Sequence, residues 1–457
     1  MPTDDATHRA SVVQLLLPEL RSLLENRPQD AGEIFEELHP ADGADLLSRL
    51  EDEEVQRLLP HLDPAEAARL LEYVEPSLSA RYLQEQQQEL AADIVEEMDA
   101  DDVVEILTHF EDDEQEELLA KMEPEERGEA EALLSHEEGT AGRLMTPYFK
   151  TVPLEGTAAQ ALTSAREGAR EGWPVTSLYV VDQSGVLRGQ LSLMNVLAAE
   201  AETAVEELME ETRFSVRVDT DQEEVARVIS KYDLLSVPVT DADDRIVGVI
   251  TVDDVVDVLT EEATEDAQKL GAVQPLDNPY FQTGFWSMAQ KRAVWLVLFF
   301  FAELITGNVM HAYEGVLQSA LSLVFFVPLI LSSGGNSGAQ SSTLVTRALA
   351  IGEVRLQDIG RVFGRELLMG FALGCVVGIM GYGRALMLDS DPRVAIIVST
   401  TLVGVVTAGT LGGAMLPLIL RRIGLDPALS SSAFVASIVD IVGVFLYLTL
   451  AKLVLGL

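Results

Sequence analysis

Cysteine is almost absent from this chain, and so are the residue patterns of common catalytic and metal sites. Cys375 is the single cysteine among 457 residues and lies in an apolar run, so there is no disulfide framework. The six histidines show no zinc-ligand spacing, and no CxxC, HExxH or GxxxxGK[ST] pattern occurs. An EF-hand starting at Asp241 also fails, because Ile246 and Val252 hold its glycine and glutamate positions. We therefore expect a protein that is not an enzyme.

Basic residues are scarce, but only in one part of the chain. Before Phe285 the chain contains 66 acidic and 20 basic side chains, whereas the remainder contains 9 and 11. A strongly acidic soluble part thus precedes a nearly neutral apolar part. So negative a surface repels phosphates, which argues against nucleic acid and favours cations, basic partners or solubility alone. The polar N-terminus, Met1 to Ala10, lacks the apolar core of a signal peptide, so we expect the acidic part in the cytoplasm.

Residues 1–140 are predicted to form an acidic helical N-domain. Apolar residues recur at helical spacing, as in Leu46, Leu47 and Leu50, and prolines interrupt the pattern repeatedly. Short helices divided in this way favour a stack of helical hairpins, although the sequence similarity between successive units is weak.

Residues 142–261 contain a duplication. Leu144-Met145-Thr146 has a counterpart in Leu208-Met209-Glu210, and each copy continues with a strand, a helix, two strands and a helix. This β-α-β-β-α order resembles a tandem pair of cystathionine-β-synthase (CBS) domains, at residues 142–200 and 203–261. Such pairs are usually regulatory.

The rest of the chain is predicted to form a connecting helix over residues 262–290 and a transmembrane domain of five helices over residues 291–457. The apolar segments are roughly 291–312, 317–349, 362–387, 394–420 and 429–453, and each can span a bilayer as a helix. With the N-terminus cytoplasmic and the C-terminus outside, eight Lys or Arg residues flank the inner ends and three flank the outer ends, which satisfies the positive-inside rule. The fold class is a multidomain α + α/β protein of the cell (inner) membrane that crosses it several times.

The second apolar segment contains an unusual run of small and polar residues, Ser332 to Gln340. We expect the helix to be interrupted there, because freed backbone is tolerated where it lines a water-filled cavity. Gly335 and the amides of Asn336 and Gln340 are then candidates for a pore lining. Close helix packing through small residues is the alternative.

Asp440 is the only charged residue between Leu429 and Ala451 and lies at the middle of that apolar stretch. A carboxylate at the centre of a membrane helix costs about 2.5–3.5 kcal/mol on insertion scales, so it is expected to face a pore, a partner or water. A cation is the simplest ligand for it, and a hydrogen bond to a neighbouring helix is the alternative. Asp426 either binds metal or only caps the last helix. Glu303, inside the first segment, could be a proton site, a dimer contact or a snorkelling end residue.

A second cluster of acidic residues lies in the soluble part, around the second CBS copy and the connector. Its i,i+4 pairs at 261/265 and 262/266 destabilise a helix by about 0.2–0.5 kcal/mol each. Such a helix gains if a divalent cation bridges it to another acidic surface. A solvated acidic face is the alternative.

Over nearly its whole length the chain resembles the MgtE family of magnesium channels and transporters. The order of parts is the same: an acidic helical N-domain, a CBS pair, an acidic plug helix and five membrane helices. Local motifs carry the resemblance too, namely Gly334-Gly335-Asn336, Gly413-Ala414-Met415-Leu416-Pro417, Leu425-Asp426-Pro427-Ala428 and Val439-Asp440-Ile441-Val442-Gly443. One departure is Ser430-Ser431-Ser432, where the family often has asparagine or glycine followed by proline.

The resemblance implies a homodimer in which Asp440 of each subunit holds a hydrated Mg²⁺ in a pore on the two-fold axis. It also implies cytosolic Mg²⁺ sites, and Asp426 matches a membrane-proximal metal residue. The residues that match ligands of the cytosolic sites are Asp101, Glu105, Asp221, Ser230 through its backbone carbonyl, Asp233, Asp254, Asp257, Glu262, Glu265 and Asp266. Residues 248–254 resemble the ribose-binding stretch of nucleotide-binding CBS domains and add ATP as a candidate regulator, although they also make an ordinary strand-to-helix turn.

The predicted function is therefore a Mg²⁺-selective channel or transporter for magnesium uptake that cytosolic Mg²⁺ closes. One alternative is an exchanger that couples Mg²⁺ to Na⁺ or protons, with Glu303 as the coupling site. A second is a membrane-tethered adenylate sensor that conducts no ions.

Overall fold

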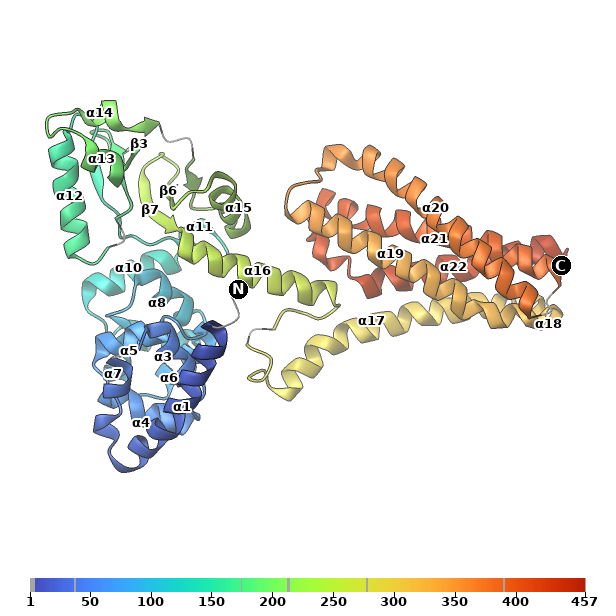
Figure 1. The fold of residues 1–457 in the computed structure, drawn as a ribbon, viewed down its shortest axis with the longest axis horizontal. Coiled ribbons are helices and arrows are strands. Elements are labelled where there is room, and N and C mark those ends of the chain that lie inside the picture. Colours follow the sequence, from blue (N-terminus) through green and yellow to red (C-terminus); the bar gives the residue numbers. More distant parts are fainter. Residues whose placement is uncertain are drawn as a thin grey trace. The chain divides into compact units, whose positions relative to one another are not determined.

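The computed structural model describes residues 5–36, 38–173, 175–211, 214–276, 278–388 and 391–456. The chain divides into two compact units, Met1–Thr260 and Glu261–Leu457. The first unit consists of short helices and two small sheets, and the second of long helices (Figure 1).

A regular series of short helices builds the N-domain. It follows α1 (Asp5–Asn26), η1 (Pro28–Asp30) and α2 (Glu33–Glu36). The series is α3 (Pro40–Leu47), α4 (Asp52–Leu58) with η2 (Leu59–His61), α5 (Pro64–Leu71), α6 (Pro76–Gln84), α7 (Gln88–Val95), α8 (Ala100–Leu107), α9 (Asp112–Leu119) and α10 (Pro124–Leu134). The α-helices of the series begin at positions 40, 52, 64, 76, 88, 100, 112 and 124, a constant 12-residue step. Helices two apart in the chain pack together, so odd and even members form two columns.

A pair of apolar residues at or near the end of each helix from α3 to α9 explains this packing. The pairs recur with the same step as the helices and are all buried: Leu46-Leu47, Leu58-Leu59, Leu70-Leu71, Tyr82-Leu83, Ile94-Val95, Ile106-Leu107 and Leu118-Leu119. The predicted helical N-domain is confirmed. The 12-residue step was missed because the residues between the apolar pairs differ from one repeat to the next.

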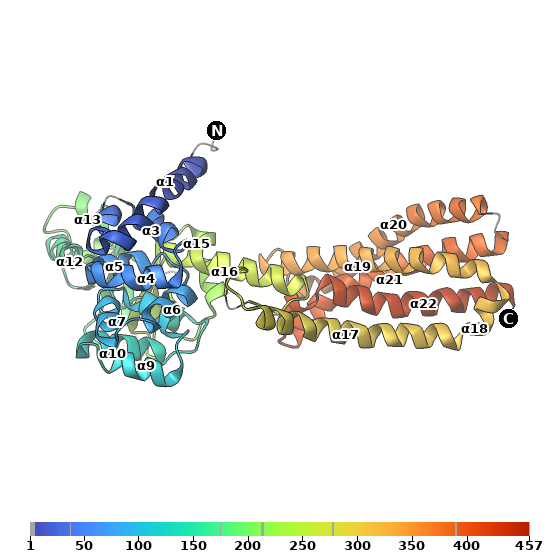
Figure 2. The same ribbon diagram turned by 90° about the horizontal axis from the view of Figure 1, so that it is seen from below.

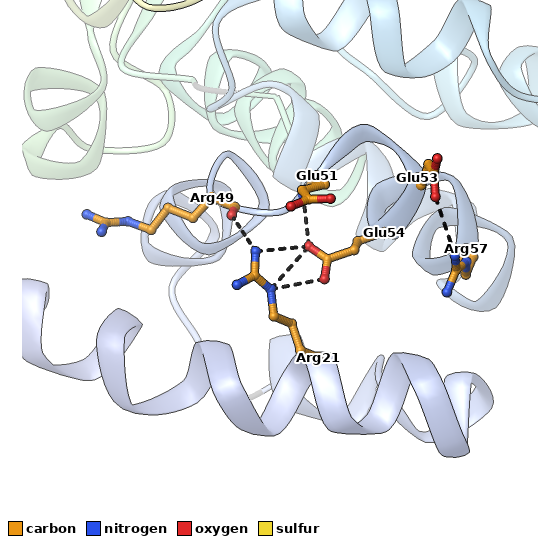
Figure 3. Close-up of polar contacts among 6 residues, drawn as sticks. All are labelled: Arg21, Arg49, Glu51, Glu53, Glu54 and Arg57. Atoms are coloured by element: carbon orange, nitrogen blue, oxygen red, sulfur yellow. Dashed lines mark hydrogen bonds and ion pairs between the residues drawn. The ribbon is translucent and has the colours of Figure 1, made fainter.

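Arg21 ties the long helix α1 to α4 (Figure 3). Its Nε lies 3.0 Å from Glu54 Oε1 and donates to Glu54 Oε2 at 3.2 Å. Glu54 Oε2 also accepts from the backbone N–H of Glu51 at 2.8 Å, which completes a capping box at the start of α4. Half-exposed pairs of this kind contribute only about 0–1 kcal/mol, so the contact mainly orients α1.

The CBS pair contains the predicted duplication. The first copy comprises α11 (Ala141–Leu144), β1 (Thr151–Pro153), α12 (Ala158–Arg170), β2 (Ser177–Val181), β3 (Leu187–Ser192) and α13 (Leu193–Ala198), followed by α14 (Val205–Leu208) and β4 (Glu210–Glu211). The second comprises β5 (Val216–Arg217), α15 (Gln222–Tyr232), β6 (Ser236–Thr240), β7 (Ile246–Thr251) and α16 (Val252–Leu270). In each copy the first strand pairs parallel and the next two pair antiparallel, as the β-α-β-β-α order predicts.

The two CBS copies are joined directly. Thr146 of the first copy forms an antiparallel bridge with Val249 of the second. The Tyr179 hydroxyl and Ser236 Oγ lie 2.9 Å apart in a hydrogen bond that is buried between the two sheets. The two copies are therefore in direct contact, although each has its own hydrophobic cluster, and that of the second copy is continuous with the core of the N-domain.

The helix predicted for residues 262–290 has different bounds. The last helix of the second CBS copy, α16, continues without a break to Leu270, where it ends in a turn with Ala272 at a φ of 58°. An irregular segment follows, and the next helix begins only at Phe285. The prediction was wrong at both ends, because no proline or glycine separates the CBS helix from its extension and Gly271 stops it early.

The described residues contain five helices long and apolar enough to cross a membrane. They are α17 (Phe285–Ala312), α19 (Val327–Ala350) preceded by η3 (Leu321–Phe326), α20 (Ile359–Met387) preceded by η4 (Leu356–Asp358), α21 (Pro392–Arg422) and α22 (Ser432–Leu455). Shorter α18 (Glu314–Ser319) and η5 (Pro427–Leu429) connect them. In both views these long helices run side by side (Figures 1 and 2).

The predicted interruption of the second membrane segment is not present. α19 is a continuous helix through Ser332–Gln340, and the break in its span comes earlier, at η3. The small residues pack instead of freeing the backbone: a Cβ on Gly334 would lie 2.2 Å from Val405 Cγ1 of α21. Gly334 therefore lets α19 and α21 approach without a break in either helix, as the packing alternative expects, while the pore lining by Gly335, Asn336 and Gln340 stays a prediction.

Candidate ion pathway and cytosolic acidic site

Asp440 lies where α22 crosses α19, directly beside Gly335. A Cβ built on Gly335 would lie 3.2 Å from the Ala436 Cβ and 3.8 Å from Asp440 Oδ1. Gly335 therefore fits closely against Ala436, one turn before Asp440, and the Asp440 carboxylate lies within van der Waals distance of α19. Asp440 is half-buried within the chain.

One face of α19 beside Asp440 is polar and exposed. It carries Ser332, Asn336 and Gln340, which follow one another at the four-residue spacing of a helix face. Asn336 Nδ2 donates to Ser332 Oγ at 3.2 Å, which orients the amide along the helix. These hydroxyl and amide groups form one stripe of the otherwise apolar α19, beside the Asp440 carboxylate of α22, and we call Ser332, Asn336 and Gln340 the polar stripe.

Asp426 caps a helix, although this helix is η5 and not α22, and its second carboxylate oxygen pairs with a lysine. Its Oδ1 accepts from the backbone N–H of Ala428 at 2.8 Å and caps η5. Its Oδ2 accepts from Lys269 Nζ at 2.6 Å, and Lys269 also pairs with Glu265 Oε1 at 2.5 Å. These two carboxylates raise the pKa of Lys269 against the effect of its partial burial. An internal cation therefore bridges two residues that were predicted as metal ligands.

The serines that depart from the family pattern hold the start of α22 in place. Ser430 is fully buried, and its carbonyl and hydroxyl accept from Ser342 Oγ of α19 at 2.8 and 3.2 Å. Ser431 caps α22 by accepting from the Phe434 N–H at 3.2 Å. Hydroxyl groups thus satisfy the backbone at this turn, and they fix the helix that carries Asp440 to the helix that carries the polar stripe.

In the first unit, Asp101 of α8 lies near Asp254 at the start of α16. Burial, followed by repulsion from Asp254, raises the pKa of Asp101. Burial also raises the pKa of Asp254 to about 6, although Thr251 Oγ1 donates to its Oδ2 at 2.6 Å. Within the described ranges, Asp101 Oδ1 is enclosed without a hydrogen-bond partner. Two carboxylates in this condition gain from a bound cation.

Three further carboxylates extend this cluster and were missed in the sequence. Asp99 is the N-cap residue of α8, and its backbone N–H donates to Glu72 Oε1 at 3.3 Å. Burial, followed by repulsion from Asp101 and then Glu72, raises the pKa of Asp102 to about 9. The 12-residue repeat could have revealed two of them, because it makes Asp99 an N-cap and places Asp102 in the first turn of α8.

The other predicted ligands of the first unit are not brought into one place. Asp221 caps the start of α15 by accepting from the Glu223 N–H at 2.9 Å, while Ser230 and Asp233 lie exposed at its far end. Asp233 is the C-cap, in a left-handed conformation with φ 51°. The 11 residues of α15 separate its ends by about 16 Å, so Asp221 and Asp233 cannot share an ion within one chain.

Glu105 of α8 and Asp257 of α16 are exposed. Glu262, Glu265 and Asp266 follow on the part of α16 that belongs to the second unit. For the part of the chain that the structure describes, no group of three or more His, Cys, Asp or Glu residues is arranged to hold a metal ion. The predicted residues are therefore present as pairs and single carboxylates in the described part of the chain.

Three family profiles match the chain. The MgtE profile, described as a divalent cation transporter, matches residues 327–450, the MgtE intracellular N domain matches residues 38–139, and the CBS domain matches residues 205–261. The magnesium transporter MgtE of Thermus thermophilus is 42% identical over 323 residues, which are 71% of this chain and 72% of that protein. The chain belongs to the MgtE family of magnesium transporters.

Other members of the family are more distant. The magnesium transporters MgtE of Enterococcus faecalis and Bacillus subtilis are each 31% identical, over 70% of this chain and 70% of theirs. Family membership and the five apolar helices confirm a multi-pass membrane protein, as predicted.

Two solved structures resemble the soluble part. The crystal structure of the soluble part of a magnesium transporter superposes with a TM-score of 0.51 at 32% identity, covering 55% of this chain and 99% of that one. The cytosolic domain of the Mg²⁺ channel MgtE in complex with ATP gives 0.50 at 37% identity, covering 52% and 97%. Both support the predicted order of a helical N-domain and a CBS pair.

Proposed function

We propose that the protein is a Mg²⁺-selective channel for magnesium uptake whose ion path follows the polar stripe of α19. The observation that supports this proposal most strongly is the position of Asp440, half-buried beside Gly335 and next to exposed amides of the same span. Mg²⁺ dehydrates reluctantly, so a site of carboxylate and amide oxygens suits an ion that keeps its water shell. A membrane potential of 100 mV supplies about 2.3 kcal/mol per charge to drive entry.

A homodimer follows from the same stripe. Exposed amides and a carboxylate are costly against lipid, because unsatisfied polar groups in hydrocarbon cost several kcal/mol each. A second copy that faced the first across this stripe would shield both and would place two Asp440 side chains around one water-filled path. The arrangement also suits a divalent ion, since two carboxylates balance its charge.

Cytosolic Mg²⁺ is proposed to close this path. Crowded carboxylates such as Asp101 and Asp254 repel one another when no cation is bound, and a bound ion favours the arrangement that holds them together. The flanking Lys and Arg residues favour an N-terminus in the cytoplasm and a C-terminus outside the inner membrane. ATP is proposed as a further regulator on the CBS pair, because the related cytosolic domain was solved with ATP.

Uptake of Mg²⁺ into proteoliposomes tests the pore proposal. Asp440→Asn keeps the shape of the side chain but removes its charge, and we expect it to abolish most of the flux at a fixed membrane potential. Asp391→Asn is the matched control, because Asp391 is an exposed cap of α21 whose amide counterpart still accepts a hydrogen bond. Unchanged flux in Asp440→Asn would exclude Asp440 from the ion path.

One observation favours a coupled exchanger as the second candidate. Glu303 of α17 is near enough to Asp440 of α22 for their charges to interact. Glu303 could then carry a proton in exchange for Mg²⁺. A pH indicator inside weakly buffered liposomes separates the two candidates, because an exchanger moves protons out in fixed proportion to the Mg²⁺ that enters and a channel does not. A nucleotide sensor without transport predicts no flux under any of these conditions.

A further inference from the structure

Four aromatic rings lie exposed in the short segment that leads into the first membrane helix. Tyr280 is 66% exposed, Phe281 97%, Phe285 77% and Trp286 81%. They form two edge-to-face pairs, Tyr280 with Phe281 and Phe285 with Trp286, each with ring centroids 5.3 Å apart. The sequence from 278 to 290 contains no charged side chain. Fully burying one such ring is worth about 1.5–3 kcal/mol, so a cluster left bare in this chain points to something that covers it.

The length of α17 shows where this cluster lies along the span. Its 28 residues extend about 42 Å, whereas the hydrocarbon core is about 30 Å thick. The charged residues Lys291 and Arg292 are expected to stay outside the hydrocarbon, so the hydrocarbon core begins after them. The stretch from Ala293 to Ala312 is then long enough to cross the core. Phe285 and Trp286 therefore lie about 10 Å outside the hydrocarbon, at the level of the lipid headgroups.

Hydrogen bonds hold the segment that precedes α17 close to the start of this helix. Lys291 Nζ donates to the carbonyl of Pro275, and the Gln274 N–H donates to the carbonyl of Lys291 at 3.3 Å. These bonds fold the segment back on the start of α17, so Tyr280 and Phe281 stay near the membrane surface instead of extending away from it. Arg292 is exposed at the edge of the hydrocarbon, where its long side chain can reach a lipid phosphate.

We propose that residues 278–292 form a membrane-surface anchor. In this anchor Tyr280, Phe281, Phe285 and Trp286 insert into the headgroup layer of the leaflet from which α17 starts, and Arg292 pairs with phospholipid phosphates. The occupant is the bilayer because the segment is continuous with a membrane span and its rings combine an apolar body with polar tips on Tyr280 and Trp286. Such side chains are typical of the interface between lipid and water. The proposal does not depend on which ion the protein conducts.

Depth-dependent quenching of tryptophan fluorescence tests the anchor in the full-length protein in liposomes. Trp295→Phe leaves Trp286 as the tryptophan beside the membrane, and Trp286→Phe leaves Trp295, nine positions or about 13 Å further along the helix. Trp173 belongs to the first unit and stays in both variants as a constant background. Both substitutions keep an aromatic ring, so both variants should fold.

The two quenchers are phospholipids that carry either a nitroxide on the headgroup or bromine deep in the acyl chain. In Trp295→Phe we expect at least about twofold stronger quenching by the headgroup label than by the deep label. In Trp286→Phe we expect a smaller ratio, because Trp295 lies just inside the hydrocarbon and therefore nearer the deep label. Three results would overturn the anchor: stronger quenching of Trp286 by the deep label, quenching only by aqueous iodide, or protection from every quencher. The last would mean that a second copy of the chain covers the rings.

Discussion

At the scale of single residues, Lys269 occupies the place between two carboxylates that were predicted to bind a metal ion. The sequence singles out Glu265 and Asp426 as metal ligands but gives no reason to connect them, since they lie far apart in the chain. The structure places one ammonium group between them, at 2.5 and 2.6 Å. The cation that the carboxylates require is here supplied by the protein itself.

Lys269→Met should destabilise the protein in the absence of divalent cations by about 1–2 kcal/mol, because it leaves two half-buried carboxylates facing each other. Millimolar Mg²⁺ should restore part of the loss by taking the place of the ammonium. Thermal unfolding in detergent, with EDTA or with Mg²⁺, measures both effects. The double variant Lys269→Met/Asp426→Asn is the control and should gain less from Mg²⁺. Equal gains would show that the vacated carboxylates do not bind the ion.

Asp102 provides a residue-scale prediction about pH. Its pKa is raised from about 4 in the unfolded chain to about 9, so the native state favours the protonated carboxyl. The resulting stabilisation is complete below about pH 4 and is lost as the pH rises towards 9. In EDTA, the unfolding temperature of the first unit should therefore fall between pH 5 and pH 9.

Asp102→Asn should flatten this decline, because the amide does not ionise. Asp93→Asn, an exposed carboxylate on the neighbouring helix α7, should leave it unchanged. Differential scanning fluorimetry of the whole protein measures the slopes. The same slope in both variants would mean that other groups control the pH response.

At the scale of elements, the sequence predicted the types of structure well and some of their boundaries poorly. The β-α-β-β-α order was readable because β-branched strands alternate with amphipathic helices and the pattern occurs twice. The continuity of α19 could not be predicted in this way. A run of glycine and serine destabilises a helix in water, whereas in a membrane the same run lets the helix pack closely against a neighbouring helix. The outcome depends on Val405 and Gly409 of α21, which no local pattern connects to Gly334.

The packing of α20 on α21 offers a matched test of this reasoning. A Cβ at Gly374 would lie 2.9 Å from Val403 Cα and from Val403 O, and backbone atoms cannot move aside as a side chain can. Gly374→Ala should therefore lower stability by about 1–3 kcal/mol. Gly383→Ala makes the same change in the same helix where nothing lies within 4 Å, and it should be neutral. The unfolding midpoints of both variants and of the parent protein in detergent measure this difference. If both variants unfold at the same midpoint as the parent, the close contact at Gly374 is refuted.

At the scale of the whole molecule, charge is divided along the chain. The net charge of −44 originates in the part before Phe285, while the membrane spans are close to neutral. Composition alone therefore predicted a soluble acidic part and an apolar part. It could not predict which carboxylates would be crowded, because the crowding of Asp101 with Asp254 joins α8 to a helix that lies beyond the whole first CBS copy in the chain.

Neutralising the cytosolic carboxylates should separate closing from conduction. We expect Asp254→Asn/Asp257→Asn/Glu262→Gln to conduct Mg²⁺ but to resist closure by millimolar cytosolic Mg²⁺, because fewer charges remain for the ion to bridge. Patch recordings with Mg²⁺ varied on the cytosolic side measure the inhibition. Asp243→Asn/Asp244→Asn/Glu210→Gln removes the same charge elsewhere in the CBS pair and should close normally. Normal closure of the first triple variant would disprove a gating role for these carboxylates.

Because the N-domain helices repeat with a constant step, it matters whether an even or an odd number of repeats is added to this domain or removed from it. Consecutive helices alternate between two columns, so removing two adjacent repeats shortens the stack by one level and leaves every later helix in its own column. Removing a single repeat instead transfers each later helix to the opposite column. The acidic first turn of α8 would then face away from Asp254. Natural or engineered length variants of this domain should therefore keep the acidic site only when whole pairs of helices are gained or lost.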